Sequence, residues 1–227
     1  MIVDSTEQML EIAADNPGCK MLYISSEEVY GLPKSEKPIC EDYVGAINSL
    51  NIRSCYPLGK KVCELLCFNY FTEYGIDVKI IRPTVIHGLL QKYNEQRVVN
   101  EILRCIVENR NLVMKSAGLT KKCLMYSLDA IAAMFTVLTK GKAGEAYNTS
   151  NPDTFITVRD LASGLFEKFN PSIKVEFAEQ DTAVSEGYLP QRSLLQDISK
   201  IKALGWEPIT SLEKIYEVDI ERFTKQV

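Results

Sequence analysis

The sequence has no glycine-rich turn of the form Gly-x-x-Gly-x-x-Gly or Gly-x-Gly-x-x-Gly between a strand and a helix, although it contains 12 glycines. In parallel α/β proteins such a turn brings backbone N–H groups close to the diphosphate of a dinucleotide. The usual phosphate cradle is absent from these residues. We therefore expect the chain alone to bind a dinucleotide weakly or not at all.

The chain also has little net charge and no recognisable metal set. A formal charge of −4 and a pI near 5.3 give neither nucleic acid nor an acidic membrane a general reason to bind. The seven cysteines show no paired Cys-x-x-Cys spacing, and His87 is the only histidine. We therefore expect free thiols in a reducing compartment and no metal site.

No apolar run approaches membrane-spanning length, and no secretory signal is recognisable at the start of the sequence. Residues 1–8 lack the basic start and the long apolar stretch of a signal peptide. We expect a soluble, cytoplasmic protein.

Apolar periodicity and cap residues predict alternating helices and strands. Ser5 is the expected N-cap of an opening helix, with Gln8 three residues later, and Gly75 ends a long second helix. The expected order is helix 5–15, strand 21–24, helix 55–74 and strand 76–81. Later helices are expected at 98–107, 130–139, 157–169, 198–204 and 211–223, with short strands at 112–114, 146–148 and 174–177. This alternation predicts an α/β protein with a right-handed, parallel sheet.

A tyrosine and a lysine stand one helical turn apart at the start of the long helix. Because positions four apart share a helix face, the Lys60 ammonium is expected beside the Tyr56 ring. A phenol is a poor base at neutral pH, and a nearby cation favours its phenolate form. The pair could therefore remove a proton from a substrate hydroxyl.

Two hydroxyls and a carboxylate follow the first expected strand. Ser25 and Ser26 come directly after residues 21–24, and Glu28 lies two residues further on. Ser26 could hydrogen-bond the substrate oxygen that Tyr56 deprotonates, and Glu28 could act as a second acid or base. Together these groups favour proton and hydride removal at a carbinol carbon. A Tyr-x-x-x-Lys pair taken alone is more often a solvated helix face.

The order and spacing of several segments resemble the extended short-chain dehydrogenase/reductase family of NAD-dependent sugar-nucleotide epimerases, dehydratases and decarboxylases. The UDP-glucuronate decarboxylase and dTDP-glucose 4,6-dehydratase branches are the most similar, and the likeness spans nearly the whole chain. The segments are Ser25 to Gly31, Glu41 to Tyr43, Arg53 to Glu64, Ile81 to Pro83, Arg97 to Val99, Tyr126 to Asp129, Tyr147-Asn148 and Leu204 to Pro208.

The resemblance implies a role for each matching residue. Tyr56 takes the hydroxyl proton as hydride passes to NAD, giving a transient 4-keto sugar, and Lys60 also holds the nicotinamide ribose. Ser26 shares the proton, and Glu28 is the carboxylate that decarboxylases and dehydratases use beside it. The residues expected near NAD are Tyr56, Lys60, Ser25 and Pro83.

The chain departs from the family pattern where a substrate is expected to bind. Val85 stands in place of an asparagine, and His87 replaces an aromatic residue and is more simply read as structural. Lys122 stands where decarboxylases carry an arginine, and a lysine cannot form the same bidentate fork. Arg97 and Arg192 are candidate diphosphate contacts, although each could equally be a surface cation.

The resemblance also implies a domain organisation. We expect residues 1–90, with part of 91–150, to form a truncated Rossmann-type domain of a doubly wound parallel sheet that carries the Ser, Tyr and Lys site. Residues 91–227 are expected to be mainly a small α/β substrate-binding region with interleaved segments. The family's first strands would precede Met1, so the chain is a fragment, pairs with another polypeptide or dimerises in an altered way.

The resemblance implies a UDP- or dTDP-sugar as substrate and a homodimer through helices 5–15 and 55–74. One alternative is a non-catalytic module on the same fold that binds a sugar nucleotide or a protein. A second is a reductase that acts on a carbonyl compound other than a nucleotide sugar.

Overall fold

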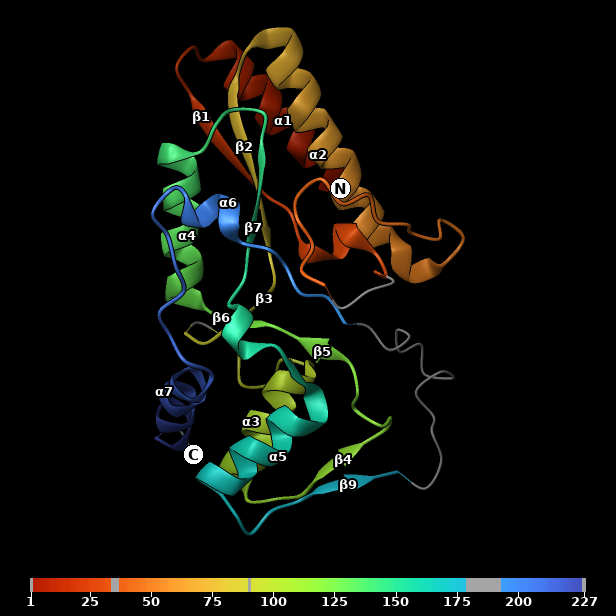
Figure 1. Cartoon of the computed structure of the whole chain (residues 1–227), viewed down its shortest axis with the longest axis vertical. Helices are drawn as coiled ribbons and strands as arrows, with labels where there is room; N and C mark the ends of the chain where they lie inside the picture. The colour runs from red at the N-terminus through yellow and green to blue at the C-terminus, as the bar shows by residue number, and fades with distance from the viewer. Residues whose placement is uncertain (1, 34–36, 90, 179–192, 226–227) are drawn as a thin grey trace. The chain divides into compact units, whose positions relative to one another are not determined.

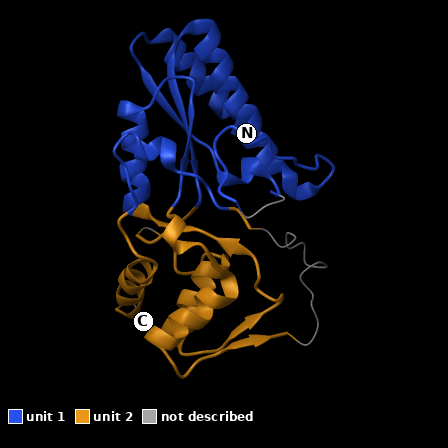
Figure 2. Ribbon diagram, viewed as in Figure 1, with its two compact units in different colours: residues 1–84, 128–150, 195–208 blue, residues 85–127, 151–194, 209–227 orange. Residues whose placement is uncertain are grey.

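A computed structural model describes residues 2–33, 37–89, 91–178 and 193–225. The chain divides into two compact units (Figure 2), each built from three stretches of sequence. Unit 1 comprises residues 1–84, 128–150 and 195–208, and unit 2 comprises residues 85–127, 151–194 and 209–227. The residues expected to carry the chemistry, from Ser25 to Pro83, all belong to unit 1.

Unit 1 is built on a three-stranded parallel sheet (Figure 1). Its strands are β1 (Lys20–Ile24), β2 (Asp77–Pro83) and β7 (Ala146–Thr149), in the order β1-β2-β7. Ile24 is in register with Ile81, and Ile81 with Tyr147. Because strands in a parallel sheet run in one direction, β1 and β2 end at the same edge of the sheet. The residues that follow them are thereby brought together.

Two helices cover one face of this sheet. Helices α1 (Ile2–Asp15) and α2 (Cys55–Tyr74) run side by side, and α2 ends at Gly75, whose φ of +68° suits a residue without a side chain. Their buried residues form an apolar cluster with alternate residues of the strands. It includes Leu10, Ala13, Tyr23, Cys63, Cys67, Ile76, Val78 and Ile80. Burying this face fixes α2, and with it Tyr56 and Lys60, over β1 and β2.

The other face of the sheet is covered by α4 (Ser127–Lys140) and the short α6 (Ser199–Lys202), as Figure 1 shows. The indole of Trp206 donates a hydrogen bond of 3.1 Å to the carbonyl of Asp129 at the start of α4. This buried bond joins the segment after α6 to α4 on the side of the sheet away from α2.

Unit 2 has its own apolar core between three helices. These are α3 (Val98–Glu108), α5 (Val158–Phe169) and α7 (Leu212–Thr224). Three two-stranded ladders surround them: β3 (Val85–His87) pairs with β6 (Leu124–Tyr126), β4 (Leu112–Met114) with β9 (Val175–Phe177), and β5 (Lys121–Lys122) with β8 (Ile156–Thr157). Only the last ladder is antiparallel.

Three short 3-10 turns complete the described elements. The turns η1 (Glu27–Tyr30) and η2 (Ile52–Ser54) belong to unit 1, and η3 (Pro152–Thr154) belongs to unit 2.

The structure confirms the expected α/β class and most of the expected elements, and it corrects the bounds of three helices. Helix α4 begins at Ser127 and not at Ala130, and α6 spans Ser199–Lys202 and not 198–204. The first helix begins at Ile2, not after a Ser5 cap, and the Thr6 hydroxyl donates to the Ile2 carbonyl within its first turn. No disulfide joins the seven cysteines, all of which lie in the described residues. Within those same ranges, no helix is both long and apolar enough to cross a membrane.

Candidate functional site

The two serines lie where β1 ends. The backbone N–H of Ser25 donates to the Ile81 carbonyl at 2.8 Å, extending the β1–β2 pairing by one residue. Both side chains are buried, with 3% and 9% exposure for Ser25 and Ser26. The Ser26 hydroxyl caps η1 by accepting a hydrogen bond of 3.2 Å from the Glu28 N–H. That bond uses a lone pair of the oxygen, so the Ser26 hydroxyl proton remains available to a ligand.

Tyr56 and Lys60 share a face of α2, as the sequence predicts. The Lys60 ammonium nitrogen lies 5.9 Å from the centre of the Tyr56 ring and 4.9 Å from that of Tyr23. It donates a hydrogen bond of 2.6 Å to the Ile24 carbonyl, the last residue of β1. Burial of the ammonium lowers the pKa of Lys60 below its usual value. Tyr56 is 45% exposed.

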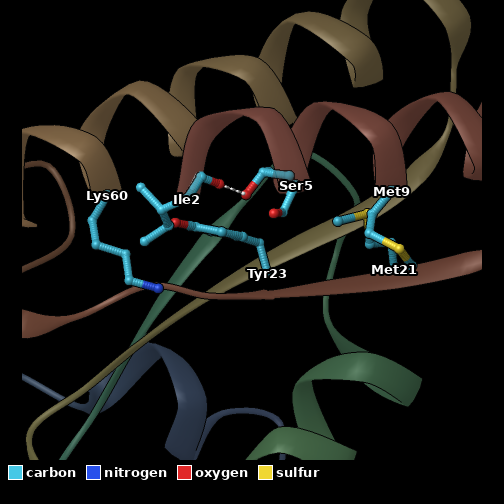
Figure 3. A pocket seen from close by; sticks show the side chains of 7 residues that line it. Ile2, Ser5, Met9, Met21, Tyr23 and Lys60 are labelled. Atoms are coloured by element: carbon cyan, nitrogen blue, oxygen red, sulfur yellow. Dashed lines mark hydrogen bonds between the residues drawn. The ribbon is translucent and has the colours of Figure 1, made fainter.

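A hollow of about 530 Å³ lies beside Lys60 (Figure 3). It is open to one side and is lined mainly by apolar side chains of α1 and β1. The lining residues are Ile2, Ser5, Thr6, Met9, Met21, Tyr23 and Lys60. Lys60 therefore lies at the rim of an apolar surface along β1, the edge strand of the described sheet.

A second carboxylate lies at the ends of the strands. Glu27, between Ser26 and Glu28, is only 5% exposed, and its carboxylate accepts a hydrogen bond of 2.9 Å from the Thr84 hydroxyl. Thr84 follows Pro83, the last residue of β2, so this bond ties the two strand ends together. Glu28 itself is half-buried in η1. The sequence pattern points to Glu28 and gives no sign that Glu27 is the buried carboxylate.

A largely buried arginine, to which the sequence alone gives no role, connects these elements. Arg82 in β2 forms a fork with the Glu64 carboxylate of α2, with bonds of 2.9 and 2.7 Å. Its third nitrogen donates to the Tyr30 hydroxyl at the end of η1, at 2.8 Å. Tyr30 in turn donates to the Asn148 side chain at 2.5 Å. Burial raises the pKa of Tyr30 to about 12, with Arg82 opposing the rise.

Two of the expected substrate-binding cations, Arg97 and Lys122, belong to unit 2. Arg97 precedes α3, is exposed, and pairs with Glu95 at 2.7 Å. Lys122 lies in β5 and is half-buried. Arg192 lies outside the described residues. The roles assigned to these three residues stay predictions.

His87 is completely buried, which agrees with the structural role expected for it. Its Nε2 lies 3.4 Å from a carboxylate oxygen of Asp219, and its ring stacks on Tyr216 with 4.9 Å between ring centres. Burial lowers the pKa of His87 to about 4, so the ring is neutral at ordinary pH. Burial raises the pKa of Asp219, with Arg222 acting in the opposite direction. Val85, which replaces an asparagine of the family pattern, lies in β3.

Comparison with known families identifies the family of the chain. Residues 2–150 match the model of the NAD dependent epimerase/dehydratase family. This match covers well over half of the chain and includes every residue of the site at the ends of β1 and β2. The chain therefore belongs to the NAD-dependent epimerase/dehydratase family.

Several relatives are enzymes of nucleotide-sugar metabolism by name. UDP-glucuronic acid decarboxylase 3 of Arabidopsis thaliana is 32% identical over 213 residues, which are 93% of this chain and 59% of the relative. UDP-glucuronic acid decarboxylase 1 of Danio rerio is 28% identical over 94% of this chain and 49% of its own length. The chain thus spans about half to three fifths of the length of these relatives.

Solved structures share the fold at low sequence identity. A dTDP-glucose 4,6-dehydratase from Bacillus anthracis, in complex with NAD, matches 99% of this chain and 68% of its own, with a TM-score of 0.80 and 22% identity. A UDP-N-acetylglucosamine 4-epimerase from Methanobrevibacter ruminantium, in complex with UDP-N-acetylmuramic acid, gives a TM-score of 0.84 at 18% identity, over 99% and 69% of the two chains. These likenesses confirm the expected fold class.

Proposed function

We propose that this chain carries the proton-transfer site of an NAD-dependent enzyme that oxidises the sugar of a nucleotide sugar to a transient 4-keto form. The observation that carries the proposal is that the end of β1, the η1 turn and helix α2 meet. Ser25 and Ser26 leave the strand there, and α2 delivers Lys60 to the last carbonyl of the strand at 2.6 Å. The family match and the names of the relatives support the same chemistry.

Each side chain has a part in this chemistry. The Tyr56 oxygen, as phenolate, is assigned the proton of the sugar hydroxyl, and the Lys60 ammonium, 5.9 Å from the ring centre, is assigned the role of the neighbouring cation. Ser26 holds the sugar oxygen with its free proton, and Glu28 acts as the second acid or base of the later step. A nucleotide-linked decarboxylation, dehydration or epimerisation would follow the 4-keto stage.

The described residues fit one end of NAD. The buried Ser25 hydroxyl has no hydrogen-bond partner among them, and a carboxamide or ribose oxygen would satisfy it. Together with Lys60 and Tyr56 of α2 and Pro83 at the end of β2, this strand end would hold the nicotinamide and its ribose. When bound, NAD supplies the hydride acceptor. No glycine-rich turn for the diphosphate occurs in the sequence, so we expect the chain alone to bind NAD weakly and to turn over no substrate.

Isothermal titration calorimetry of the 227-residue chain with NAD tests this expectation. Little heat at micromolar protein is the expected result, and tight binding would overturn it. The activity itself is tested in a chimera in which a family member supplies the glycine-rich strand, turn and helix ahead of Met1. The expected products are those of a UDP- or dTDP-sugar, with the substrate-binding cations Arg97, Lys122 and Arg192 contributed by the second half of the chain.

A homodimer is part of the same proposal. Several apolar side chains of α1 and α2 are largely exposed, and they include Met9 and Ile12 at 53%, Leu65 at 58% and Phe68 at 51%. Exposed apolar residues clustered on two adjacent helices favour association with a second copy through a four-helix contact. We place this dimer in the cytoplasm, in line with the free thiols.

A non-catalytic module that binds a sugar nucleotide is favoured by Val85, which offers no polar atom where the family pattern has an amide. The retained Ser26, Tyr56 and Lys60 favour the enzyme. Thermal shift with UDP- and dTDP-sugars, measured together with activity of the chimera, separates the two. Binding without any turnover supports the module.

A further inference from the structure

We propose that Arg82 is a positioning residue that locks the η1 turn, which carries Ser26 and Glu28, to the helix that carries Tyr56 and Lys60. The proposal rests on the proposed function, because it assigns Arg82 the task of keeping the two halves of that site in register. Arg82 does not itself touch a substrate. It lies in β2 directly before Pro83.

The first half of the argument is the geometry of α2. Tyr56, Lys60 and Glu64 are spaced by four residues, so they lie along one face of the helix. Arg82 holds Glu64 with two parallel bonds of 2.9 and 2.7 Å, and the two side chains are only 14% and 11% exposed. A bidentate fork fixes direction as well as distance, because both N–H groups must point at both oxygens. The fork therefore fixes the rotation of the face that presents Lys60 and Tyr56.

The second half is the contact of the same guanidinium with the turn. One Arg82 nitrogen donates to the Tyr30 hydroxyl and to the Glu41 carbonyl, each at 2.8 Å. Tyr30 is the last residue of η1, four residues after Ser26, and it is only 1% exposed. A single rigid, planar group thus holds both the catalytic helix and the catalytic turn.

The turn is also enclosed on its other side. Gly45 packs so closely on Tyr30 that a side-chain carbon at position 45 would lie 1.9 Å from the Tyr30 carbonyl oxygen. The Gly45 carbonyl in turn accepts a hydrogen bond of 2.8 Å from Lys61 of α2. The η1 turn is therefore linked to α2 in two ways, through Arg82 and through Gly45 and Lys61. Because the turn is closely packed, a shift of Arg82 should displace both η1 and α2.

The proposal predicts reciprocal coupling, which a purely local structural role would not produce. Glu64→Gln changes only α2, yet it should speed hydrogen exchange at the Val29 and Gly31 amides of η1 by at least about threefold. Tyr30→Phe changes only the turn, yet it should raise the rate at which a small acylating reagent modifies the Lys60 amine, also by at least about threefold. Both rates are measured by mass spectrometry on the whole chain. The exposed Lys142 amine is the internal reference for acylation.

Trp206→Phe is the matched control, because it removes one buried hydrogen bond of the same unit on the opposite face of the sheet. It should leave both readouts within about 1.5-fold of the unmodified chain. The proposal is overturned if Glu64→Gln changes exchange in α2 alone, or if Trp206→Phe moves the readouts as much as the two test variants. Arg82→Lys serves if either variant fails to fold: it keeps the charge but loses the fork, and it should move both readouts.

These measurements need no turnover and no NAD. If the coupling is observed and the chimera is inactive, the proposed function is contradicted and the positioning role of Arg82 is supported. If the chimera is active and the coupling is absent, the proposed function is supported and the positioning role of Arg82 is contradicted.

Discussion

The Lys60 ammonium donates a 2.6 Å hydrogen bond to the carbonyl of Ile24, the last residue of β1. This bond joins the helix that carries Tyr56 to the strand end that carries Ser25 and Ser26. It places a cation at the strand end that Ser25 and Ser26 follow, 5.9 Å from the centre of the Tyr56 ring. We therefore expect Lys60 to matter more for chemistry than Lys20 of β1 or Lys61 of α2.

Lys60→Met should lower kcat of the chimera by about 10²- to 10⁴-fold, because the phenol of Tyr56 loses the cation that favours its ionised form. Initial rates of product formation from a UDP-sugar measure the effect. Lys20→Met, at the exposed start of β1, is the matched control and should leave kcat unchanged. Equal losses in the two variants would contradict the role assigned to Lys60.

Glu64→Met should lower the free energy of unfolding by about 3–5 kcal/mol, because it leaves the largely buried Arg82 guanidinium without its ion-pair partner, with only the Tyr30 hydroxyl and the Glu41 carbonyl as acceptors. The double variant Arg82→Met with Glu64→Met should cost clearly less than the sum of the two single changes, because neither buried charge remains. Urea unfolding followed by circular dichroism gives the four values of the cycle. Additive costs would show that the two side chains do not interact.

Unfolding should depend on pH through His87. Burial lowers its pKa to about 4, whereas an unfolded histidine titrates near ~6.5, so the unfolded chain binds the proton first. Stability from this group is fully present above that unfolded value and falls as pH drops toward 4, by up to about 3 kcal/mol. The raised pKa of Asp219 works in the opposite direction and offsets part of the loss.

The variant His87→Gln isolates this effect, because glutamine keeps a polar side chain at this position but takes up no proton in this range. Its urea midpoint between pH 7 and 4.5 should fall less than that of the unmodified chain. Parallel curves for the two proteins would exclude His87 as the source of the pH dependence.

The self-association proposed through α1 and α2 predicts that Leu65→Glu or Phe68→Glu yields a monomer. A carboxylate in an apolar contact loses its hydration without gaining a partner. Light scattering after size exclusion gives the mass of each species. Phe135→Glu is the control, because Phe135 is equally apolar and 62% exposed but lies on α4. A dimer that survives the α2 changes but not the α4 change would place the interface elsewhere.

Much of the fold could be predicted from the sequence, because strong local signals coincide with the observed elements. Thr157 and Ser211 cap α5 and α7 with the side-chain bonds that their positions suggest. The strand expected at 112–114 is observed as β4. Four other strands were not foreseen: β3, β5, β6 and β8 are each two or three residues long. A run of that length is too short to show a period of two.

The candidate site was only half visible in the sequence. Tyr56 and Lys60 are close in sequence, so helical spacing alone predicts their shared face. Arg82 bonds Glu64, 18 positions away, and Tyr30, 52 positions away, and only the packing of α2 and η1 on the sheet brings these residues together. Glu64 lies two turns after Tyr56, on the same helix face as Lys60, and its position could have indicated a buried ion pair. The sequence alone does not show that Arg82 is its partner.

The most direct test of the account is the absorbance of reduced nicotinamide at 340 nm when the chimera, loaded with NAD, is mixed with UDP-glucuronate. We predict a transient rise in the unmodified chimera. We also predict its loss by at least about 10²-fold in rate with Tyr56→Phe, while the fold and nucleotide-sugar binding persist. An undiminished rise in the Tyr56→Phe protein would show that another group accepts the proton and would contradict the account.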